Sequence, residues 1–451
     1  MSRNLICTVL ILCALFAARA TLAEPRTLED STTVDRWTLP NGLEVVARDV
    51  RGTGAISITW GYRIGLDNDP ADRPGLASLL AEVAFTAPAG DTPERARNEM
   101  ESLRPQGWNL RVTRRQTLFT ETATTAQFPG VLHQIAGRMR GVTVTATELR
   151  GSLATVRRTL GEKYSGAADQ MLYWQVREYA RGLDQGAIAA LAAAKGLDRE
   201  TPASVRQAIA RAYVPANGVL VLAGDLSGLD LHAIIASEFD ALPAGEHLPA
   251  PPAPRFDSVA VVLMQPGVDA PAAVLGLAAP ALSDTLHPSF YMALLVLGGR
   301  VKLDWGPPSP PLVTRFQYSL LDDPGFARFY PPADSEQTPD PRSFSAILEQ
   351  AIDDLLTGTI QRMTYDSFRY NLLWMMGGPM PRALVDGVRQ DPAALNVLCT
   401  SLASQALWGD EVFWAEYRRR FDASVSPGFD FWANWLRDPG HQATLLLVPK
   451  R

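Results

Sequence analysis

A nine-residue pattern occurs once in each half of this 451-residue chain, and it constrains the fold more than any other feature of the sequence. The first copy is TATELRGSL (Thr145–Leu153) and the second is TYDSFRYNL (Thr364–Leu372). Each copy follows a segment with helical periodicity, and each half ends in an apolar stretch typical of a strand. Elements that recur in the same order over so long a period indicate that one domain was duplicated.

A proline-rich stretch separates the two halves. Residues 243–256 (PAGEHLPAPPAPRF) contain five prolines, and proline at this density favours an extended, semi-rigid connector. We therefore predict an N-terminal domain over residues 24–242, a linker over 243–256 and a C-terminal domain over 257–451.

The pattern within each half predicts an α+β fold. Asn41 and Gly42 lie between apolar alternations, which is typical of a hairpin turn. Residues 55–65 read as a half-buried or buried strand, whereas 147–160 have the periodicity of a helix. We expect two homologous domains, each a mostly antiparallel sheet covered by helices.

The first residues have the pattern of a secretory leader. The apolar run over residues 5–16 is too short for a stable membrane anchor, and small residues favour cleavage after Ala23, with Ala20 as the alternative. We expect residues 1–23 to be removed and the mature chain to be periplasmic or secreted, with no membrane span left. Cys399 would then be its one cysteine, so we expect no internal disulfide.

The composition is that of an ordinary globular protein. The net charge is -6 and 47% of the residues are hydrophobic. Because there is no basic footprint, we expect no nucleic-acid partner. The sequence also has no Gly-x-Ser-x-Gly elbow, P-loop or dinucleotide fingerprint.

Four segments of the chain carry a resemblance to a known family. They are TLPNGLEVV, RPGLASLLAEVAFTAP, NLRVTRRQTLFT and ARAYVPANGVLVLAGD, which begin at residues 38, 73, 109 and 210. In this order they resemble the pitrilysin and insulinase family of inverzincin metallopeptidases, in the two-domain form of the mitochondrial processing peptidase and its bacterial relatives. In active members, one helix carries the motif His-x-x-Glu-His. Its two histidines bind zinc, and its glutamate is the general base that activates the zinc-bound water.

The resemblance places this metal motif on residues that cannot form it. The two histidine positions hold Ser78 and Glu82, and the position of the general base holds Ala81. Serine is a poor zinc ligand, and alanine cannot accept a proton. None of the five histidines lies three or four residues from another, so no compact replacement site is predicted. We expect no bound zinc, no other cofactor and no catalytic residues.

The third zinc ligand of the family is a glutamate on a later helix. The matching positions here are Arg157 or Arg158, and Glu162 is the alternative if the alignment shifts by one turn. We expect one of these arginines to form a salt bridge with Glu82 in place of the metal.

In the active family one strand receives the substrate in extended form, and the matching segment here is Asn109–Thr120. Recognition through backbone groups needs little side-chain identity, so it could outlast the loss of the metal. The alternative is an ordinary half-solvated strand whose arginines guard an exposed edge. The resemblance implies a peptide-binding strand with these matching residues: Asn109, Arg114, Gln116, Thr117 and Phe119.

Active members also use an arginine and a tyrosine of the second domain to bind the substrate backbone. Arg315 and Tyr318 match them loosely, and the alternative is that both are plain strand residues. The preceding WGPPSPP segment replaces a helix of the family, because four prolines in seven residues cannot be helical.

Family members of this size commonly work in pairs, in which one subunit carries the metal and the other does not. The resemblance therefore implies a non-catalytic subunit that encloses a peptide or unfolded polypeptide together with an active metallopeptidase subunit. A stand-alone peptide-binding or structural protein is the second hypothesis. A metallopeptidase with an unrecognised metal site is the third.

Overall fold

The structure is a computed structural model. It describes residues 34–90, 108–251, 255–265, 272–294, 315–330, 349, 352–353, 392–423 and 429–449. Three predicted features lie outside the described residues: the leader over 1–23, the second copy of the repeated pattern over 364–372, and the WGPPSPP segment.

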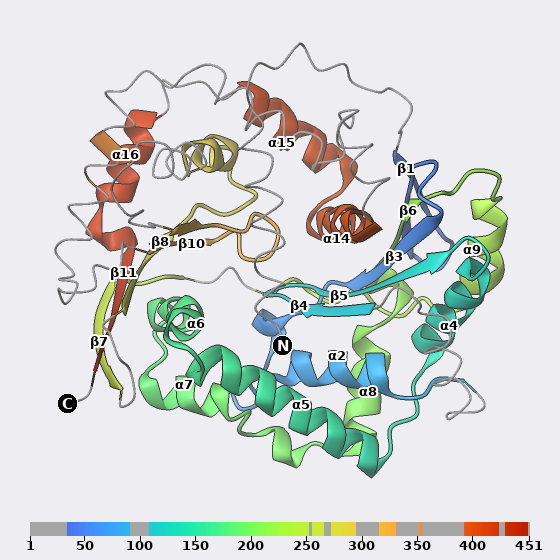
Figure 1. Ribbon diagram of the computed structural model, residues 1–451, viewed down its shortest axis with the longest axis horizontal. Helices are drawn as coiled ribbons and strands as arrows, with labels where there is room; N and C mark the ends of the chain where they lie inside the picture. Colours follow the sequence, from blue (N-terminus) through green and yellow to red (C-terminus); the bar gives the residue numbers. More distant parts are fainter. Residues whose placement is uncertain are drawn as a thin grey trace.

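The first half of the chain contains a six-stranded sheet (Figure 1). The Asn41–Gly42 turn that joins its first two strands was predicted from the sequence, and Gly42 has a φ of 87° there. Four of its five neighbouring strand pairs are antiparallel, and β2 and β6 run parallel. The order across the sheet is β1 (Val34–Thr38), β2 (Glu44–Asp49), β6 (Gly218–Gly224), β3 (Ala55–Tyr62), β5 (Thr117–Thr124) and β4 (Trp108–Val112).

The second half contains a five-stranded sheet with the same plan. Its order is β7 (Val259–Gln265), β11 (Gln442–Pro449), β8 (Ala272–Ala278), β10 (Phe326–Tyr330) and β9 (Arg315–Gln317). Here β7 and β11 are parallel and the other neighbours are antiparallel, as in the series β2, β6, β3, β5, β4 of the first sheet. This repeated topology confirms the predicted fold class of two homologous, mostly antiparallel α+β units.

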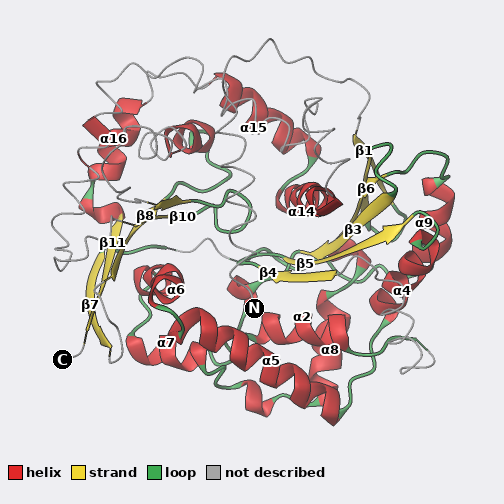
Figure 2. Cartoon of the chain, in the orientation of Figure 1, coloured by secondary structure: helices red, strands yellow, loops and turns green. Residues whose placement is uncertain are grey.

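Helices cover the faces of both sheets (Figure 2). The first half contributes α2 (Leu76–Thr86), α4 (Phe128–Arg140), α5 (Ala146–Ser165), α6 (Ala168–Ala180), α7 (Gln185–Ala192), α8 (Pro202–Ala212) and α9 (Leu231–Phe239). The second half contributes α14 (Pro392–Trp408), α15 (Glu411–Ala423) and α16 (Phe429–Arg437). Short 3-10 turns lie at η1 (Leu66–Asn68), η2 (Leu197–Arg199), η3 (Pro215–Asn217) and η5 (Pro439–His441). Between α9 and β7 the described part of the predicted linker has neither helix nor strand.

The two halves exchange helices. α14 from the second half packs on β3 and β6 of the first sheet, where Leu398, Cys399 and Leu402 are buried against Val221 and Leu118 (Figure 1). Conversely, α6 from the first half packs on β8 and β11 of the second sheet. Each sheet is therefore covered on one face by a helix that lies far away in the sequence.

Candidate functional site

The position of helix α2, which carries the degenerate metal motif, is fixed by the glycine that precedes it and by an aspartate of the preceding loop. Gly75 has a left-handed φ of 89°, and a Cβ there would lie 2.7 Å from a methyl carbon of Leu160, so only glycine fits without movement. Asp69 accepts hydrogen bonds from the backbone N–H groups of Gly75 and Ala77, both at 2.7 Å. Burial raises the pKa of Asp69 to about 7, although these hydrogen bonds act to lower it. The result is a capped helix held close to α5.

The three degenerate motif positions do not share one environment. Ala81 is fully buried in the core beside Leu80, together with most of the apolar face of α2. Ser78 and Glu82 are half-buried, and because they are four residues apart they lie on one face of the helix. This face is turned toward α5, which packs against α2.

A pocket of about 290 Å³ lies between α2, α5 and strand β4. Two side chains of β4 close it from the sheet, and every fourth residue of α5 from Thr155 onward forms its opposite wall. The lining residues are Ser78, Glu82, Leu110, Val112, Thr155, Val156, Thr159, Leu160 and Lys163.

The donors of this pocket do not fit a zinc ion. A catalytic zinc site uses three protein ligands from histidine, cysteine or carboxylate side chains, whereas the pocket offers the single carboxylate of Glu82 with neutral hydroxyls and the amine of Lys163. Across the described residues there is also no group of three histidine, cysteine, aspartate or glutamate side chains that could hold a metal ion. Whether the protein binds zinc stays a prediction that needs measurement.

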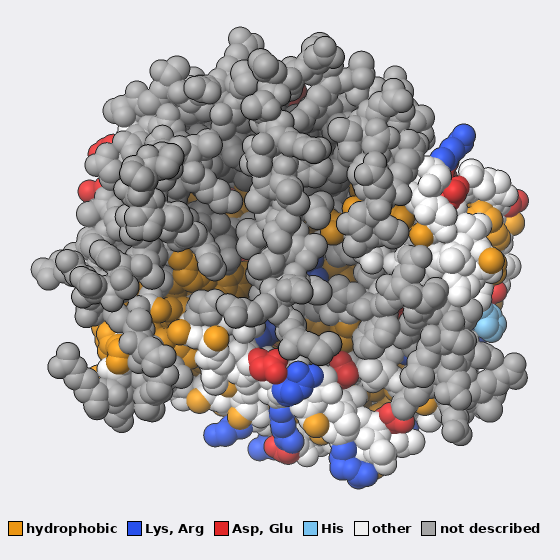
Figure 3. Space-filling model, viewed as in Figure 1, with side chains coloured by type: hydrophobic (Ala, Val, Ile, Leu, Met, Phe, Trp, Pro, Cys, Tyr) orange, Lys and Arg blue, Asp and Glu red, His pale blue; other side chains and the backbone are white. Residues whose placement is uncertain are grey.

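The predicted salt bridge between Glu82 and an arginine of α5 is wrong. Arg157 pairs with Asp198, and Arg158 pairs with Glu162 at 3.2 Å. The reason is helical geometry, since the face of α5 that lines the pocket carries residues 155, 159 and 163 and turns these arginines outward. The space-filling view in Figure 3 shows acidic and basic side chains next to one another on the described surface of the lower helices.

The carboxylates of Glu162 and Glu82 have different surroundings in this structure. Glu162 is exposed and paired, and it does not line the pocket, so it is not in position to be a third ligand. Burial raises the pKa of Glu82, and the charge of Arg158 acts in the opposite direction without a direct contact. Among the described residues, no side chain donates a hydrogen bond to the Glu82 carboxylate.

Lys163 is the pocket residue that the sequence reasoning missed. Burial lowers its pKa to about 8, and the positive charges of Arg114 and Arg111 act in the same direction. Its ammonium nitrogen lies 4.7 Å from the centre of the Trp174 ring, which is within the range of a cation–π contact. The spacing Thr155, Thr159, Lys163 at steps of four is the signal that could have identified it.

The predicted single strand Asn109–Thr120 is in fact a hairpin. Strand β4 pairs with β5 in the register Asn109 to Thr120 and Val112 to Thr117. Strand β5 also pairs with β3 on its other side, so it lies inside the sheet. Thr117 and Phe119 are buried, and of the two hairpin strands it is β4 that lies at an edge of the sheet. Asn109 is on this edge strand.

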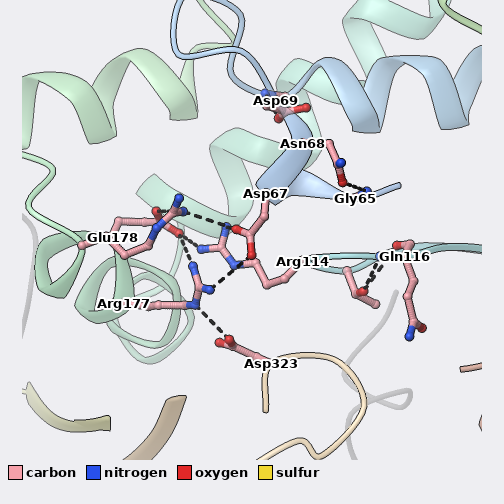
Figure 4. A network of polar contacts seen from close by, with 12 residues as sticks. Gly65, Asp67, Asn68, Asp69, Arg114, Gln116, Arg177, Glu178 and Asp323 are labelled. Carbon is pink, nitrogen blue, oxygen red and sulfur yellow. Dashed lines mark hydrogen bonds and ion pairs between the residues drawn. The ribbon is translucent and has the colours of Figure 1, made fainter. Parts of the chain in front are cut away.

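Arg114 and Gln116 lie in the hairpin turn, and their side chains point into the protein (Figure 4). Arg114 forms ion pairs with Glu178 of α6 and, at 3.8 Å, with Asp67. Gln116 donates a hydrogen bond to the carbonyl of Ser404 in α14 at 3.1 Å. Both side chains therefore hold the exchanged helices, and a peptide-binding role of the segment that contains them stays a prediction.

A buried network of ion pairs continues from Arg114 into the second half (Figure 4). Arg177 of α6 donates to Asp323 at 2.9 Å and lies 3.6 Å from Asp67. Arg328 of β10 donates to the second oxygen of Asp323 at 3.0 Å. Although burial acts to raise it, the charges of Arg177 and Arg328 hold the pKa of Asp323 below its usual range. The network fixes the hairpin turn against the second half.

The two residues of the predicted accessory site lie in the second sheet and in the core next to it. Arg315 begins β9 opposite Tyr330. The Tyr318 hydroxyl donates to the carbonyl of Pro324 at 2.5 Å and lies 2.6 Å from Nε2 of the buried His287. Nδ1 of His287 lies 2.7 Å from the hydroxyl of Tyr417, and burial lowers the pKa of His287 to about 4. The Tyr318 hydroxyl is thus engaged in the core of the second half and is not available to a substrate.

Comparison with known proteins points to one family. Residues 199–325 match the family model described as the peptidase M16 inactive domain. No curated protein matches the sequence.

Solved structures match over nearly the whole chain. A protease from Helicobacter pylori is 17% identical, with a TM-score of 0.70, over 93% of this chain and 100% of that chain. A peptidase M16 inactive domain from Pseudomonas fluorescens is 16% identical, with a TM-score of 0.66, over 93% and 98%. The periplasmic protease PqqL from Escherichia coli is 14% identical, with a TM-score of 0.65, over 95% of this chain but 48% of that chain.

These matches confirm the predicted pitrilysin-type fold, because solved structures that include M16-like peptidases match 93–94% of the chain. In the part of the chain that the structure describes, no helix has both the length and the apolar character needed to cross a membrane.

Proposed function

We propose that this chain, which its fold and residues 199–325 relate to the M16 or pitrilysin-type peptidases, holds an extended polypeptide at β4 and does not hydrolyse it. The observation that carries the proposal is the position of β4, which forms the edge of the first sheet and also closes the pocket of Ser78 and Glu82. Among the described strands, β4 is paired with β5 alone.

The backbone of β4 is suited to add another strand. In an antiparallel pair, hydrogen-bonded and non-hydrogen-bonded residue pairs alternate. The hairpin turn sets the phase, because the N–H of Thr113 donates to the carbonyl of Gln116 at 2.8 Å. Val112, one residue earlier, and Leu110 therefore direct their N–H and C=O groups away from β5, toward the open edge.

The absence of hydrolysis follows from the chemistry of the pocket. Hydrolysis by this family requires a zinc ion and a general base, and the pocket supplies one carboxylate, Glu82, with no histidine. Ala81, at the position of the base, is buried in the core. Strand addition needs only backbone groups, so it can operate without the metal.

A homologous subunit with an intact zinc motif is the partner that we infer. PqqL contains more than the part that this chain covers, and a second M16 unit facing β4 would close the site over the polypeptide. The predicted leader and the periplasmic relative support export to the periplasm or out of the cell.

The proposal is tested by a proline at an outward N–H group of β4. Val112→Pro removes that donor but no hydrogen bond to β5, and proline is tolerated in edge strands at such positions. We expect binding of an unstructured peptide to weaken at least about tenfold, as expected when a hydrogen bond of about 1–1.5 kcal/mol and its neighbours are lost. Fluorescence anisotropy with a labelled peptide measures this.

Val112→Ala is the matched control, because it shortens the same side chain and keeps the N–H group. It is expected to bind the peptide clearly more tightly than Val112→Pro, because the backbone donor of the edge is retained. If Val112→Pro is folded by circular dichroism and binds the peptide as tightly as Val112→Ala, the edge of β4 is not the binding site.

A further inference from the structure

We propose that the pocket beneath β4 selects an acidic side chain of the bound polypeptide, with the ammonium group of Lys163 as its partner. The inference rests on the proposed function, since it assigns one side-chain preference to the polypeptide that β4 holds. In this proposal the ammonium group of Lys163 supplies the positive charge that a metal ion supplies in active members of the family.

Lys163 lacks a counter-ion in the described structure. It lines the pocket from the last turn of α5 and has the Trp174 ring on one side. None of the described carboxylates lies within ion-pair distance of its nitrogen. Lys163 is half-buried; an ammonium group that is partly removed from water without a partner is unfavourable, and a carboxylate brought by a ligand would relieve that cost.

The charges around Lys163 favour an anion at its end of the pocket. Arg111 and Arg114 both act on Lys163, and each of them already has a carboxylate partner within the protein: Asp322 for Arg111, and Glu178 for Arg114. Lys163 is therefore the cation of this group that is left for a ligand.

Glu82 lies toward the opposite end of the pocket. Gly75 at the start of α2 is close to Leu160, whereas Glu82, nearly two turns later, is influenced by the charge of Arg158. The two helices thus run in opposite directions, and Lys163 is level with the start of α2. A ligand carboxylate next to Lys163 is accordingly kept away from the Glu82 carboxylate.

The geometry of strand addition brings side chains into this pocket. Leu110 and Val112 both line it, so it lies on one face of the sheet. A strand added beside β4 places every second side chain on that face, at intervals of about 6.6–6.8 Å. One of these side chains would enter beside Lys163, and the apolar walls of Val112 and Leu160 would surround its methylene groups.

The test uses the full chain and a set of capped peptides. Acetylated and amidated Thr/Val peptides of about nine residues, the length of a long strand, carry a single glutamate or glutamine at each position in turn. We expect one position at which glutamate binds at least about tenfold more tightly than glutamine, which corresponds to about 1.4 kcal/mol. Anisotropy measures the affinity of each pair.

Substitution of the lysine identifies the partner. Lys163→Met is expected to remove the preference for glutamate, so that the glutamate and glutamine peptides bind it equally. Lys163→Glu is expected to reverse the preference, so that a lysine at the same peptide position binds best. Lys195→Met, which removes an exposed lysine outside the pocket, is the matched control and should keep the preference for glutamate.

Two outcomes would overturn the inference while the proposed function stands. The first is equal binding of the glutamate and glutamine peptides to the unchanged chain, while Val112→Pro still weakens the binding of both peptides. The second is a preference that appears only when the peptide has a free C-terminal carboxylate, because that assigns Lys163 to a chain end. If Val112→Pro and Val112→Ala bind the peptide with equal affinity, the proposed function itself is overturned.

Discussion

Replacing Asp323 with alanine is expected to lower the free energy of unfolding by about 3–5 kcal/mol, the usual cost of removing one partner of a buried ion pair. Asp323 accepts hydrogen bonds from both Arg177 and Arg328, whose side chains are each 2% exposed. Without Asp323, two buried guanidinium groups would lose their closest counter-charge. Denaturant unfolding monitored by circular dichroism measures the change.

The neighbouring Asp322 provides the control. Its ion pair joins it to Arg111, whose side chain is 45% exposed, so Asp322→Ala is expected to cost about 1 kcal/mol or less. Equal costs for the two variants would contradict the role of the buried network.

The same network predicts a dependence on pH. Because the folded-state pKa of Asp323 is held below its usual value, its stabilising effect is present above about pH 4, the unfolded pKa of aspartate, and is lost as the pH falls through the folded value. In Asp323→Ala this acid-dependent loss should be absent, so the two stability curves should converge at low pH.

Residues 24–242 expressed alone are expected not to fold. Without α14, the face of the first sheet that carries Val46, Leu118 and Val221 would be exposed to water. Each large apolar side chain that remains exposed forgoes about 1.5–3 kcal/mol, and several of them together approach the net stability of a domain, about 5–15 kcal/mol. The isolated half should bind the dye ANS and lack a cooperative thermal transition.

Cleavage within the linker of the folded protein is the complementary experiment. If a protease site is inserted after Ala250 and cut, the two pieces should elute together in size-exclusion chromatography, because α6 and α14 remain docked. A cooperatively folded, monomeric 24–242 fragment would contradict the account of the helix exchange.

The fold could be predicted from the sequence because its determinants are local or repeated. The Asn41–Gly42 turn and the apolar character of β3 depend on neighbouring residues, and the duplication implied a second sheet of the same kind. The exchange of α6 and α14 could not be predicted, because periodicity reveals that a helix has an apolar face but not which sheet covers it. The boundaries of the predicted domains remain predictions.

The site was less predictable for similar reasons. The segment that contains the Arg114–Gln116 turn alternates like a single strand in the sequence. The hairpin and the burial of β5 were therefore not predicted. Matching by family position pointed to Arg157 and Arg158, whereas the pitch of α5 directs Thr159 and Lys163 to the pocket. The roles of Arg114 and Asp323 depend on ion pairs with residues of α6 that are distant in the sequence: Arg114 pairs with Glu178, and Asp323 pairs with Arg177.

Native mass spectrometry of the mature chain, mixed with equimolar zinc and an unstructured peptide, tests the central claim most directly. The account predicts a complex whose mass is that of one chain plus one intact peptide, with no stoichiometric zinc adduct and no peptide fragments after prolonged incubation. A zinc adduct of one ion per chain, accompanied by chelator-sensitive cleavage of the peptide, would contradict it.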